Sequence, residues 1–477
     1  MTATSDLRLP ARTDDGLATD RGPRAEGPPA RPAGLDAGSP ARTASPGGGA
    51  AGPASGEGEE RYDIVGVGFG PSNMALAAAC SEDPGAQHAV FFDAAEGPSW
   101  HEGMLLPDAG LQVSFAKDLV TFRNPTSSLS FLNFLVERGR IHDFFNRGSS
   151  APLRVEFFAY LRWAAERLAE YVRYRHRVTA VQPQRSGETI TGYRVTVEGP
   201  EGVSTVLARH VVVAAGLQPN VPEGLPEDER VLHTSRYLHR VEGLGEVRSA
   251  VVLGGGQSAA EVALDLRSRF PDARVHLVHS RFGIVPADST PFANRIFDNT
   301  SIDRLYEAPE EVRERLGRIH ANTNNSVVHE STIQALYDAW YADSWAGRER
   351  IVFHDASRIA GVEPSEDGLD VAVRNDLDGD VEHLRSDVLA LGTGYRPLDL
   401  RALLGEDADL LARDAEGRVV AERDYSVRWQ APAEGRLVAV GITQHQHGVS
   451  ATLLSNIALR AGEILASLTG ERAGAAR

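Results

Sequence analysis

Short apolar runs that close on glycine-rich turns and then lead into helical patterns occur twice in this sequence. The first run is residues 64–65, its turn is residues 66–70, and a helical stretch follows at 73–80. The second run is residues 249–253, and it passes through residues 254–256 into another helical pattern. Strand–turn–helix units of this kind build parallel, doubly wound sheets. The pattern therefore predicts an α/β protein with two Rossmann-like domains.

Other segments continue the alternation of strands and helices. Further strands are expected at residues 89–92, 211–213, 274–278 and 437–440, and a strand followed by a Gly-Thr-Gly turn is expected at 387–395. Apolar residues three and four positions apart predict amphipathic helices at 131–138, 155–171 and 452–468. Two stretches break this rhythm. Residues 98–125 are expected to form an ordered loop over a site, and residues 286–341 are rich in Asn, Thr and Ser.

The first glycine turn has the features of a dinucleotide site. Gly66 is expected to form the tight turn, and Gly68 leaves room for a pyrophosphate that the N-terminus of the next helix faces. The following strand ends in Asp93, an acid suited to the ribose hydroxyls. The alternative is an ordinary glycine-rich turn, and Pro71 stands where the usual pattern has its third glycine. The predicted cofactor-binding residues of this turn are Gly66, Gly68, Gly70, Pro71 and Ser72.

The second glycine turn predicts a nicotinamide cofactor. Gly254 and Gly256 precede Gln257 and Ser258 at the expected start of a helix. The next strand is followed by Arg281 rather than by an acid, and a cation there suits the 2′-phosphate of NADPH. The alternative for Arg281 is a solvated surface charge. Two dinucleotide sites on one chain indicate electron transfer from NADPH to FAD.

The order of these segments predicts that the second domain is inserted in the first. Residues 1–60 are expected to be a disordered tail, because residues 22–58 carry almost no aliphatic or aromatic side chain beyond Leu35. The expected folded parts are an FAD-binding domain at 61–235, an NADPH-binding domain at 236–285, a small substrate-binding region at 286–341, the second part of the NADPH-binding domain at 342–395, and the completion of the FAD-binding domain at 396–477.

Composition removes several classes of protein from consideration. The net charge of −17 argues against nucleic acid or an anionic membrane as a partner. Cys80 is the only cysteine, so neither an intramolecular disulfide nor a cysteine-based metal cluster is possible, and a buried structural thiol is expected. No metal site is predicted. The sequence shows no signal-peptide pattern and no long apolar span, and a cytoplasmic location is expected by elimination.

Several motifs together resemble the flavin-dependent N-hydroxylating monooxygenases, the L-ornithine N5- and L-lysine N6-hydroxylases of siderophore biosynthesis. The matching segments are DIVGVGFGPSN at 63–73, WHEGML at 100–105, LQVSFAKDLVT at 111–121, NPTS at 124–127, GQSAAE at 256–261, TNNSVV at 323–328, TGY at 393–395 and TLLS at 452–455. Their order and spacing extend over nearly the whole chain beyond the tail. The resemblance also suggests a homo-oligomer, a tetramer in this family.

The resemblance assigns roles to individual residues. It implies FAD contacts from residues 93–101, including Asp93, Trp100 and His101, and from Gln112, Val178, Thr452, Leu453 and Leu454. It implies that Gln257 and Ser258 hold NADPH, and that Asn324, Asn325 and Ser326 reach toward NADPH or the substrate. Lys117 and Asn294 would fix the carboxylate and α-amine of an amino acid, with Ser455 near the substrate. The alternatives are a surface ion pair of Lys117 with Asp118 or with a neighbouring residue, and turn-forming roles for Asn294 and Asn324.

Three positions depart from the family pattern. Ala451 and Asn124 stand where aspartate is common, and Arg295 stands where many members carry an acid. Because Arg295 is next to Asn294, it is the position expected to alter which amine is accepted.

The resemblance implies that NADPH reduces FAD, that a C4a-hydroperoxyflavin forms with O2, and that the side-chain amine of L-ornithine or L-lysine becomes a hydroxylamine. No side chain acts as a nucleophile, because the flavin carries the chemistry. The alternatives are an N-hydroxylase of a diamine such as putrescine or cadaverine or of another amino acid, a C- or S-oxygenating monooxygenase, and a flavin-binding regulatory or structural protein.

Overall fold

The computed structural model describes residues 59–470 except Pro84, Ala86, Pro226 and Asn325, and all of them belong to one compact unit. Apart from Glu59 and Glu60, the tail predicted at 1–60 lies outside the described residues. None of the helices in the described part of the chain is long and apolar enough to span a membrane.

The first sheet combines a parallel part with an antiparallel part. Its strand order is β3 (Val172–Tyr174), β2 (Ala89–Asp93), β1 (Arg61–Val67), β6 (Gly202–Val213), β5 (Thr189–Gly199) and β4 (Arg177–Ser186), and β17 (Leu437–Ala439) pairs with the end of β6. Strands β1, β2, β3, β17 and the second half of β6 run parallel. Strands β4, β5 and the first half of β6 form an antiparallel meander, which the sequence analysis did not anticipate.

The second sheet is entirely parallel. Its order is β11 (Ile351–His354), β10 (Arg274–Val278), β9 (Ser249–Leu253), β15 (Val388–Leu391) and β8 (Val231–His233). Because β17 returns to the first sheet after all of these strands, the second unit is inserted in the first, and the predicted α/β fold class is confirmed. Strand β8 falls inside the range 61–235 expected for the first domain, so the second sheet begins earlier in the chain than 236.

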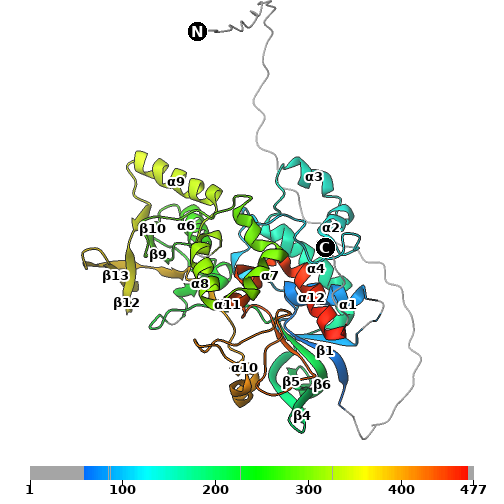
Figure 1. Cartoon of the computed structure of the whole chain (residues 1–477). Helices are drawn as coiled ribbons and strands as arrows, with labels where there is room; N and C mark the ends of the chain where they lie inside the picture. The colour runs from blue at the N-terminus through cyan, green and yellow to red at the C-terminus, as the bar shows by residue number, and fades with distance from the viewer. Residues whose placement is uncertain (1–58, 84, 86, 226, 325, 471–477) are drawn as a thin grey trace, which may run out of the picture. The chain divides into compact units, whose positions relative to one another are not determined.

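Helices cover one face of each sheet (Figure 1). Helices α1 (Pro71–Ser81), α2 (Phe131–Glu137), α4 (Arg154–Arg167) and α12 (Ile457–Thr469) bury an aromatic-rich core against the first sheet. Cys80 lies in this core, as predicted, and burial raises the pKa of its thiol to about 12. Helices α6 (Gln257–Arg269) and α9 (Glu330–Trp345) cover the second sheet.

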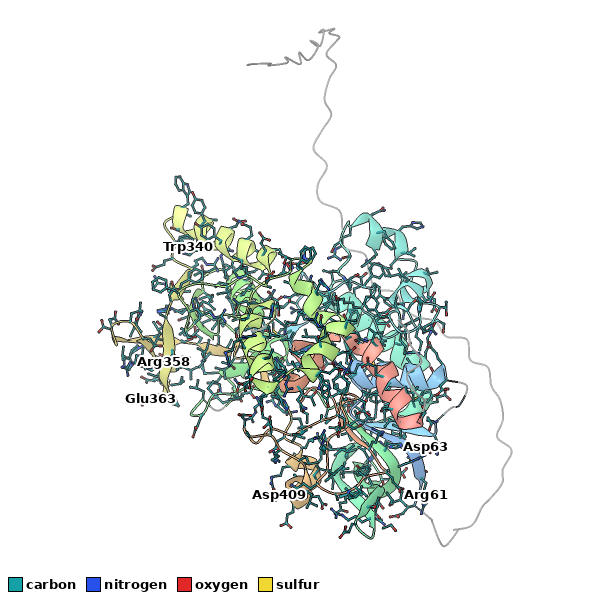
Figure 2. The ribbon with its side chains drawn as sticks, in the orientation of Figure 1. Arg61, Asp63, Trp340, Arg358, Glu363 and Asp409 are labelled. Carbon is teal, nitrogen blue, oxygen red and sulfur yellow. The ribbon has the colours of Figure 1, made fainter. Side chains whose placement is uncertain are left out.

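A three-stranded antiparallel sheet covers the other face of the second sheet. It consists of β12 (Ser357–Ser365), β13 (Gly368–Asn375) and β14 (Val381–Ser386). Arg358 and Glu363 lie on β12, and Trp340 lies on α9 (Figure 2). The chain enters the inserted unit at β7 (Gln218–Pro219) and leaves it at β16 (Tyr395–Arg396), and these two short strands pair with each other.

The region at 286–341 contains helices that the polar composition concealed. Helices α7 (Asn299–Glu307) and α8 (Glu310–Ile319) precede α9, and Ile302 is their only buried residue. The helical period is nevertheless present in the sequence, because Ile302, Leu305 and Tyr306 in α7 and Val312, Leu316 and Ile319 in α8 recur at three- and four-residue spacing. These helices could therefore have been predicted. The helix expected at 452–468 begins later, at Ile457, because two short turns occupy residues 449–456.

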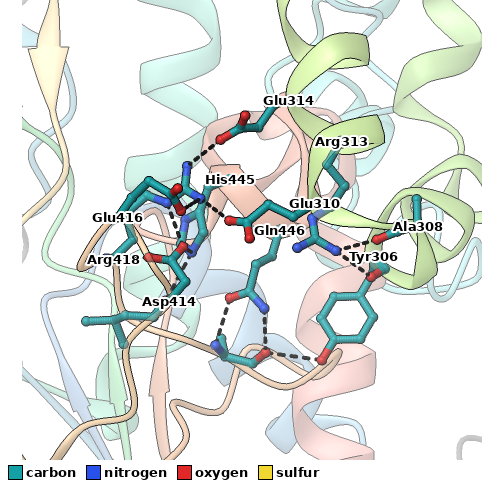
Figure 3. A network of polar contacts seen from close by, with 12 residues as sticks. Tyr306, Ala308, Glu310, Arg313, Glu314, Asp414, Glu416, Arg418, His445 and Gln446 are labelled. Carbon is teal, nitrogen blue, oxygen red and sulfur yellow. Dashed lines mark hydrogen bonds and ion pairs between the residues drawn. The ribbon is translucent and has the colours of Figure 1, made fainter.

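A network of charged side chains holds α8 against the C-terminal part of the chain (Figure 3). The Arg418 guanidinium donates to Glu310 at 2.5 Å, to Asp414 at 2.6 Å and to Glu416 at 2.9 Å, and lies 3.6 Å from Glu314. Glu310, Glu314 and Glu416 lie close together. Since Arg418 already donates to two of these carboxylates, the group is an ion-pair network that fastens a helix.

Gly66 provides a test of the packing of the first sheet. A Cβ at this position would lie 2.0 Å from the ring of Phe91, which is fully buried on β2. Gly66→Ala should therefore force Phe91 to move and destabilise the fold by about 1–3 kcal/mol, seen as a lower Tm in calorimetry. Gly97→Ala is the matched control, because its Cβ would meet open space. Equal Tm values for the two variants would contradict this packing.

Candidate active site

A cavity of about 1890 Å³ lies where the carboxyl ends of the parallel strands of the two sheets meet. The turn after β1, residues 214–216 after β6, the turn after β9 and residues 392–394 after β15 all line it. A site for one small ligand takes roughly 300–1,000 Å³. The cavity is therefore large enough for more than one ligand, and it lies at the strand ends where doubly wound sheets bind them.

The first glycine turn is shaped to accept an anion. Gly68 has a φ of +84°, and a Cβ there would lie 2.9 Å from the carbonyl oxygen of Ala214. Gly70 precedes α1, faces open space and offers no side-chain cap, and Pro71 fills the first helical position. Proline is favoured at that position because its missing N–H has no helical partner to lose. The free N–H groups at the start of α1 are thus left for a phosphate.

Gly66 corrects one residue of the predicted set. Residues 95–98 of the range 93–101 predicted to contact FAD do not line the cavity. Gly66 was also expected to contact the cofactor, and it does not line the cavity either. Its constraint comes from the ring of Phe91 on the neighbouring strand. Glycine is required there for packing between strands, not for access to a ligand.

Asp93 holds the first turn in place. Its carboxylate lines the cavity at the end of β2, as expected for a ribose contact. The two oxygens accept hydrogen bonds from the N–H of Phe69 at 2.6 Å and from the N–H of Ala95 at 2.8 Å. Each carboxylate oxygen has a further lone pair, so Asp93 can fix the turn and still accept from a ribose hydroxyl.

The second glycine turn repeats this design. Gly254 has a φ of +136°, and a Cβ there would lie 2.3 Å from the carbonyl oxygen of Gly392. Gly256 precedes α6 without a side-chain cap, so a second helix N-terminus faces the same cavity. Ser258 and Arg281 line the cavity nearby, and the Arg281 guanidinium donates to the carbonyl oxygen of Ser326 at 2.9 Å.

The side chain of Gln257 forms hydrogen bonds with other protein groups. Its amide nitrogen donates to Glu261 at 2.7 Å and to the Thr332 hydroxyl at 2.9 Å, and its amide oxygen accepts from the N–H of His329 at 2.7 Å. These bonds fix the start of α6 relative to α9. Gln257 lines the cavity, but its side chain positions the turn.

The structure gathers the other predicted site residues around the same cavity. Those assigned to cofactors that line it are Gly68, Gly70, Pro71, Ser72, Asp93, Trp100, His101, Gln112, Val178, Gly254, Gly256, Gln257, Ser258, Arg281, Ser326, Thr452, Leu453 and Leu454. Those assigned to the substrate that line it are Lys117, Asn294, Asn324 and Ser455. Asn325 lies outside the described residues.

Lys117 faces the cavity as a half-buried cation. Burial lowers the pKa of its ammonium group and nearby Asp298 raises it. Its Nζ lies 5.6 Å from the centre of the Phe297 ring. Among the described residues it forms no ion pair with Asp118, whose buried carboxylate accepts instead from the N–H of Phe131 at 2.7 Å. The surface ion pair considered as the alternative is therefore not formed.

The three departures from the family pattern lie in different places. Ala451 is buried and lines the cavity. Asn124 and Arg295 are not among the residues that line it. The Asn124 amide donates to Glu82 at 3.0 Å, and Arg295 lies 3.8 Å from Asp298. Arg295 is therefore turned toward its own helix end.

Aromatic rings form the wall beside the loop at 98–125. His101 has a left-handed backbone with a φ of 48°, and its ring meets Trp100 edge-on at 5.0 Å and Tyr395 at 6.1 Å. His101 lines the cavity, and burial of its imidazole among the surrounding residues, together with the charge of Arg154, lowers its pKa to about 4. His101 is thus a neutral wall residue at neutral pH. Tyr395 was not singled out from the sequence.

A buried ion pair joins helices α4 and α6 at the cavity, where Arg154 is one of the lining residues, and this pair too was not predicted from the sequence. Arg154 on α4 donates to both oxygens of Glu261 on α6, at 2.7 and 2.8 Å, and to the carbonyl oxygen of Met104 at 3.3 Å. The side chains are only 15% and 9% exposed. The sequence did contain one indication of this pair. Glu261 is a charged residue on the apolar face of an alanine-rich helix, and a buried carboxylate requires a positively charged partner.

Comparisons with known proteins agree with this geometry. The family model described as L-lysine 6-monooxygenase/L-ornithine 5-monooxygenase matches residues 60–397. An L-ornithine N(5)-monooxygenase of Pseudomonas aeruginosa is 36% identical over 418 residues, which cover 85% of this chain and 93% of that protein.

Two solved structures are also similar. The ornithine N-hydroxylase of Kutzneria sp. 744, described with reduced FAD, NADP+ and L-ornithine, has a TM-score of 0.84 and 42% identity over 86% of this chain and 99% of its own. An FAD-bound cadaverine monooxygenase of Erwinia amylovora has a TM-score of 0.78 and 28% identity over 87% and 96%.

The buried ion pair between the sheets can be tested by removing one charge. Glu261→Gln leaves Arg154 without a counter-ion, and breaking a buried pair in this way costs about 3–5 kcal/mol. The Tm measured by calorimetry should therefore fall clearly. Glu246→Gln removes a carboxylate from the solvent-exposed pair with Arg248 and should change Tm little. A small effect of Glu261→Gln, no larger than that control, would refute the structural role of this pair.

Proposed function

The chain belongs to the L-lysine 6-monooxygenase/L-ornithine 5-monooxygenase family, and from this premise we propose that it N-hydroxylates the side-chain amine of L-ornithine with FAD, NADPH and O2. The observation that carries the proposal is a single cavity lined by both glycine turns and by Lys117, Asn294, Asn324 and Ser455. In the overall reaction one oxygen atom of O2 forms the N–O bond. The other leaves as water, with both electrons supplied by NADPH.

The residues present fit the two cofactors. The turns at Gly68 and Gly254 have no room for a side chain, and two uncapped helix ends face the cavity, which suits two pyrophosphates. Arg281 suits the 2′-phosphate of NADPH. Bound FAD would supply the redox chemistry, accepting hydride from NADPH and activating O2. The chain itself would position the substrate and limit its contact with water.

Lys117 is the residue that we assign to the substrate carboxylate. It is the only lysine of the chain, and all the other basic residues apart from histidine are arginines. A lysine ammonium is a compact charge on a long stem, whereas arginine is a broad planar fork. The carboxylate is thereby held at one point, and the side-chain amine reaches toward the flavin. Partial burial favours the neutral form of an amine, which is the form that can accept oxygen on nitrogen.

Three further assignments belong to this proposal. The hydroxylamine would supply siderophore or related natural-product biosynthesis. The enzyme would work in the cytoplasm, where NADPH is available. It would form a homo-oligomer, and the family suggests a tetramer.

Three aromatic side chains support self-association. They are Tyr337, Tyr341 and Trp345, which follow one face of α9 and are each more than half exposed. Light scattering of the full chain measures this assembly.

A substrate panel tests the proposal directly. Hydroxylamine formation should be fastest with L-ornithine when L-ornithine, L-lysine, putrescine, cadaverine and an acidic amino acid are compared with NADPH. A preference for cadaverine, the substrate named for one structural neighbour, would replace the amino-acid assignment by a diamine. NADPH consumption with no hydroxylamine from any amine, or oxygen found on carbon or sulfur of the product, would reject N-hydroxylation.

Replacing Lys117 separates an amino acid from a diamine. Lys117→Ala removes one charge-assisted contact, so the KM for L-ornithine should rise about 10–100-fold while kcat changes less. The KM for putrescine should stay constant because putrescine has no carboxylate. Lys117→Arg keeps the charge and should recover part of the loss. Steady-state kinetics give both constants, and an equal rise for both substrates would refute the anchoring role.

Replacing Arg281 tests the choice of nicotinamide cofactor. Arg281→Ala should raise the KM for NADPH about 10–100-fold, because one charge-assisted contact to the 2′-phosphate is lost. NADH lacks that phosphate and serves as the control, so its KM should remain the same. If both values rise together, Arg281 supports the fold of the turn and does not read the phosphate.

A further inference from the structure

Arg460 is a buried cation at the wall of the cavity. It lies on α12, is 3% exposed and belongs to the residues that line the cavity. Arginine keeps its charge in proteins because its pKa is so high. Burial lowers the pKa of Arg460 but does not change this, so a full positive charge sits beside the ligand space.

Arg460 forms hydrogen bonds with the turn that precedes its own helix. One guanidinium nitrogen donates to the carbonyl oxygens of Ser450 at 3.1 Å and Ala451 at 3.0 Å. The other donates to the carbonyl oxygen of Leu453 and to the Ser72 hydroxyl, both at 3.4 Å. The guanidinium therefore joins the turn at 450–453 to the first turn of α1, whose N-terminus faces the cavity.

Arg460 forms no ion pair in the part of the chain that the structure describes. The charge of Glu463 and the ring of Tyr425, whose centre lies 5.8 Å from the guanidinium, offset its charge only in part. The nearest acid along α12 is Glu463, and its carboxylate accepts from Arg423 at 3.1 Å and from Asn299 at 3.0 Å. Carbonyl oxygens and a hydroxyl satisfy the N–H groups of Arg460 but bring no net charge. A buried ion without a counter-ion costs several kcal/mol.

We infer that Arg460 is a further FAD-binding residue whose buried charge is balanced by the cofactor's phosphates, an inference that rests on the proposed use of FAD. Its four hydrogen bonds couple the turn at 450–453 to the start of α1, so the cofactor that neutralises the charge also stabilises this turn. Thr452 and Leu453, both assigned to FAD, belong to that turn.

Binding of flavins to the protein freed of its cofactor tests this inference, with FAD and riboflavin as the two probes. Riboflavin carries the same ring system but no phosphate. Arg460→Gln should raise the Kd for FAD at least tenfold, measured by quenching of flavin fluorescence, and should change the Kd for riboflavin less than threefold. Arg460→Lys keeps the charge and should hold the Kd for FAD within about threefold of the unaltered protein.

Arg423→Gln is the matched control. Arg423 lies close to Arg460 in the C-terminal part, but it is paired with Asp303 and Glu463 and does not line the cavity. This variant should have a lower Tm and an unchanged Kd for FAD. In contrast, Arg460→Gln should reduce the rise in Tm that FAD produces.

The outcomes separate this inference from the proposed function. If the unaltered protein does not bind FAD, the proposed function fails. If it binds FAD and Arg460→Gln binds FAD equally well, or loses FAD and riboflavin to the same extent, Arg460 is only structural and the inference is overturned. If Arg460→Gln does not fold, Arg460→Lys decides the question, since a tenfold loss of FAD affinity with the charge retained would contradict charge balance.

Discussion

The ion pair between Arg154 and Glu261 fixes the position of helices α4 and α6, and of the two sheets that they cover, relative to each other at the cavity. It is bidentate, largely buried, and joins a helix of the outer unit to a helix of the inserted one. Glu261 also accepts from Gln257, so the same carboxylate fixes the second glycine turn. A hydrophobic contact of equal size tolerates sliding, whereas two parallel hydrogen bonds between charged groups allow one register. The two uncapped helix ends consequently face one shared space.

This arrangement divides the work between backbone and side chains. The helix ends and glycine turns provide anion sites that need no side chain. Side chains supply what the backbone lacks, namely localised positive charge. Lys117, Arg281 and Arg460 each line the cavity, and we assign them to a substrate carboxylate, a 2′-phosphate and the FAD phosphates. Arg154, Arg177 and Arg358 line the same cavity. In a chain with a net charge of −17, these cations attract anionic ligands to a place that the rest of the surface does not favour.

Sequence analysis identified what is determined locally. Gly68 and Gly254 were recognised because a glycine-rich turn between an apolar run and a helical pattern is a property of a few consecutive residues, and in the structure both have a positive φ. Gly66 was assigned to the wrong task, since the Phe91 ring that requires it lies on another strand. The Arg154–Glu261 pair and the contact of Arg460 with Ser72 join residues 107 and 388 positions apart, and nothing local indicates such partners. Helices α7 and α8 were missed although their apolar residues recur at helical spacing, because the Asn, Thr and Ser residues around them favoured an irregular region. The family resemblance assigned Lys117, Asn294 and Asn324 to one site before the fold was known, and all three line the same cavity in the structure.

We propose that one oxygen atom of O2 is transferred to the side-chain nitrogen of L-ornithine in this cavity. The decisive measurement is mass spectrometry of the product formed under isotopically heavy O2 in ordinary water. We expect one heavy oxygen atom in each hydroxylated ornithine, located by fragmentation on the side-chain nitrogen, and none when the label is supplied as heavy water. Label entering from water, or NADPH consumed with heavy oxygen found only in hydrogen peroxide, would contradict it.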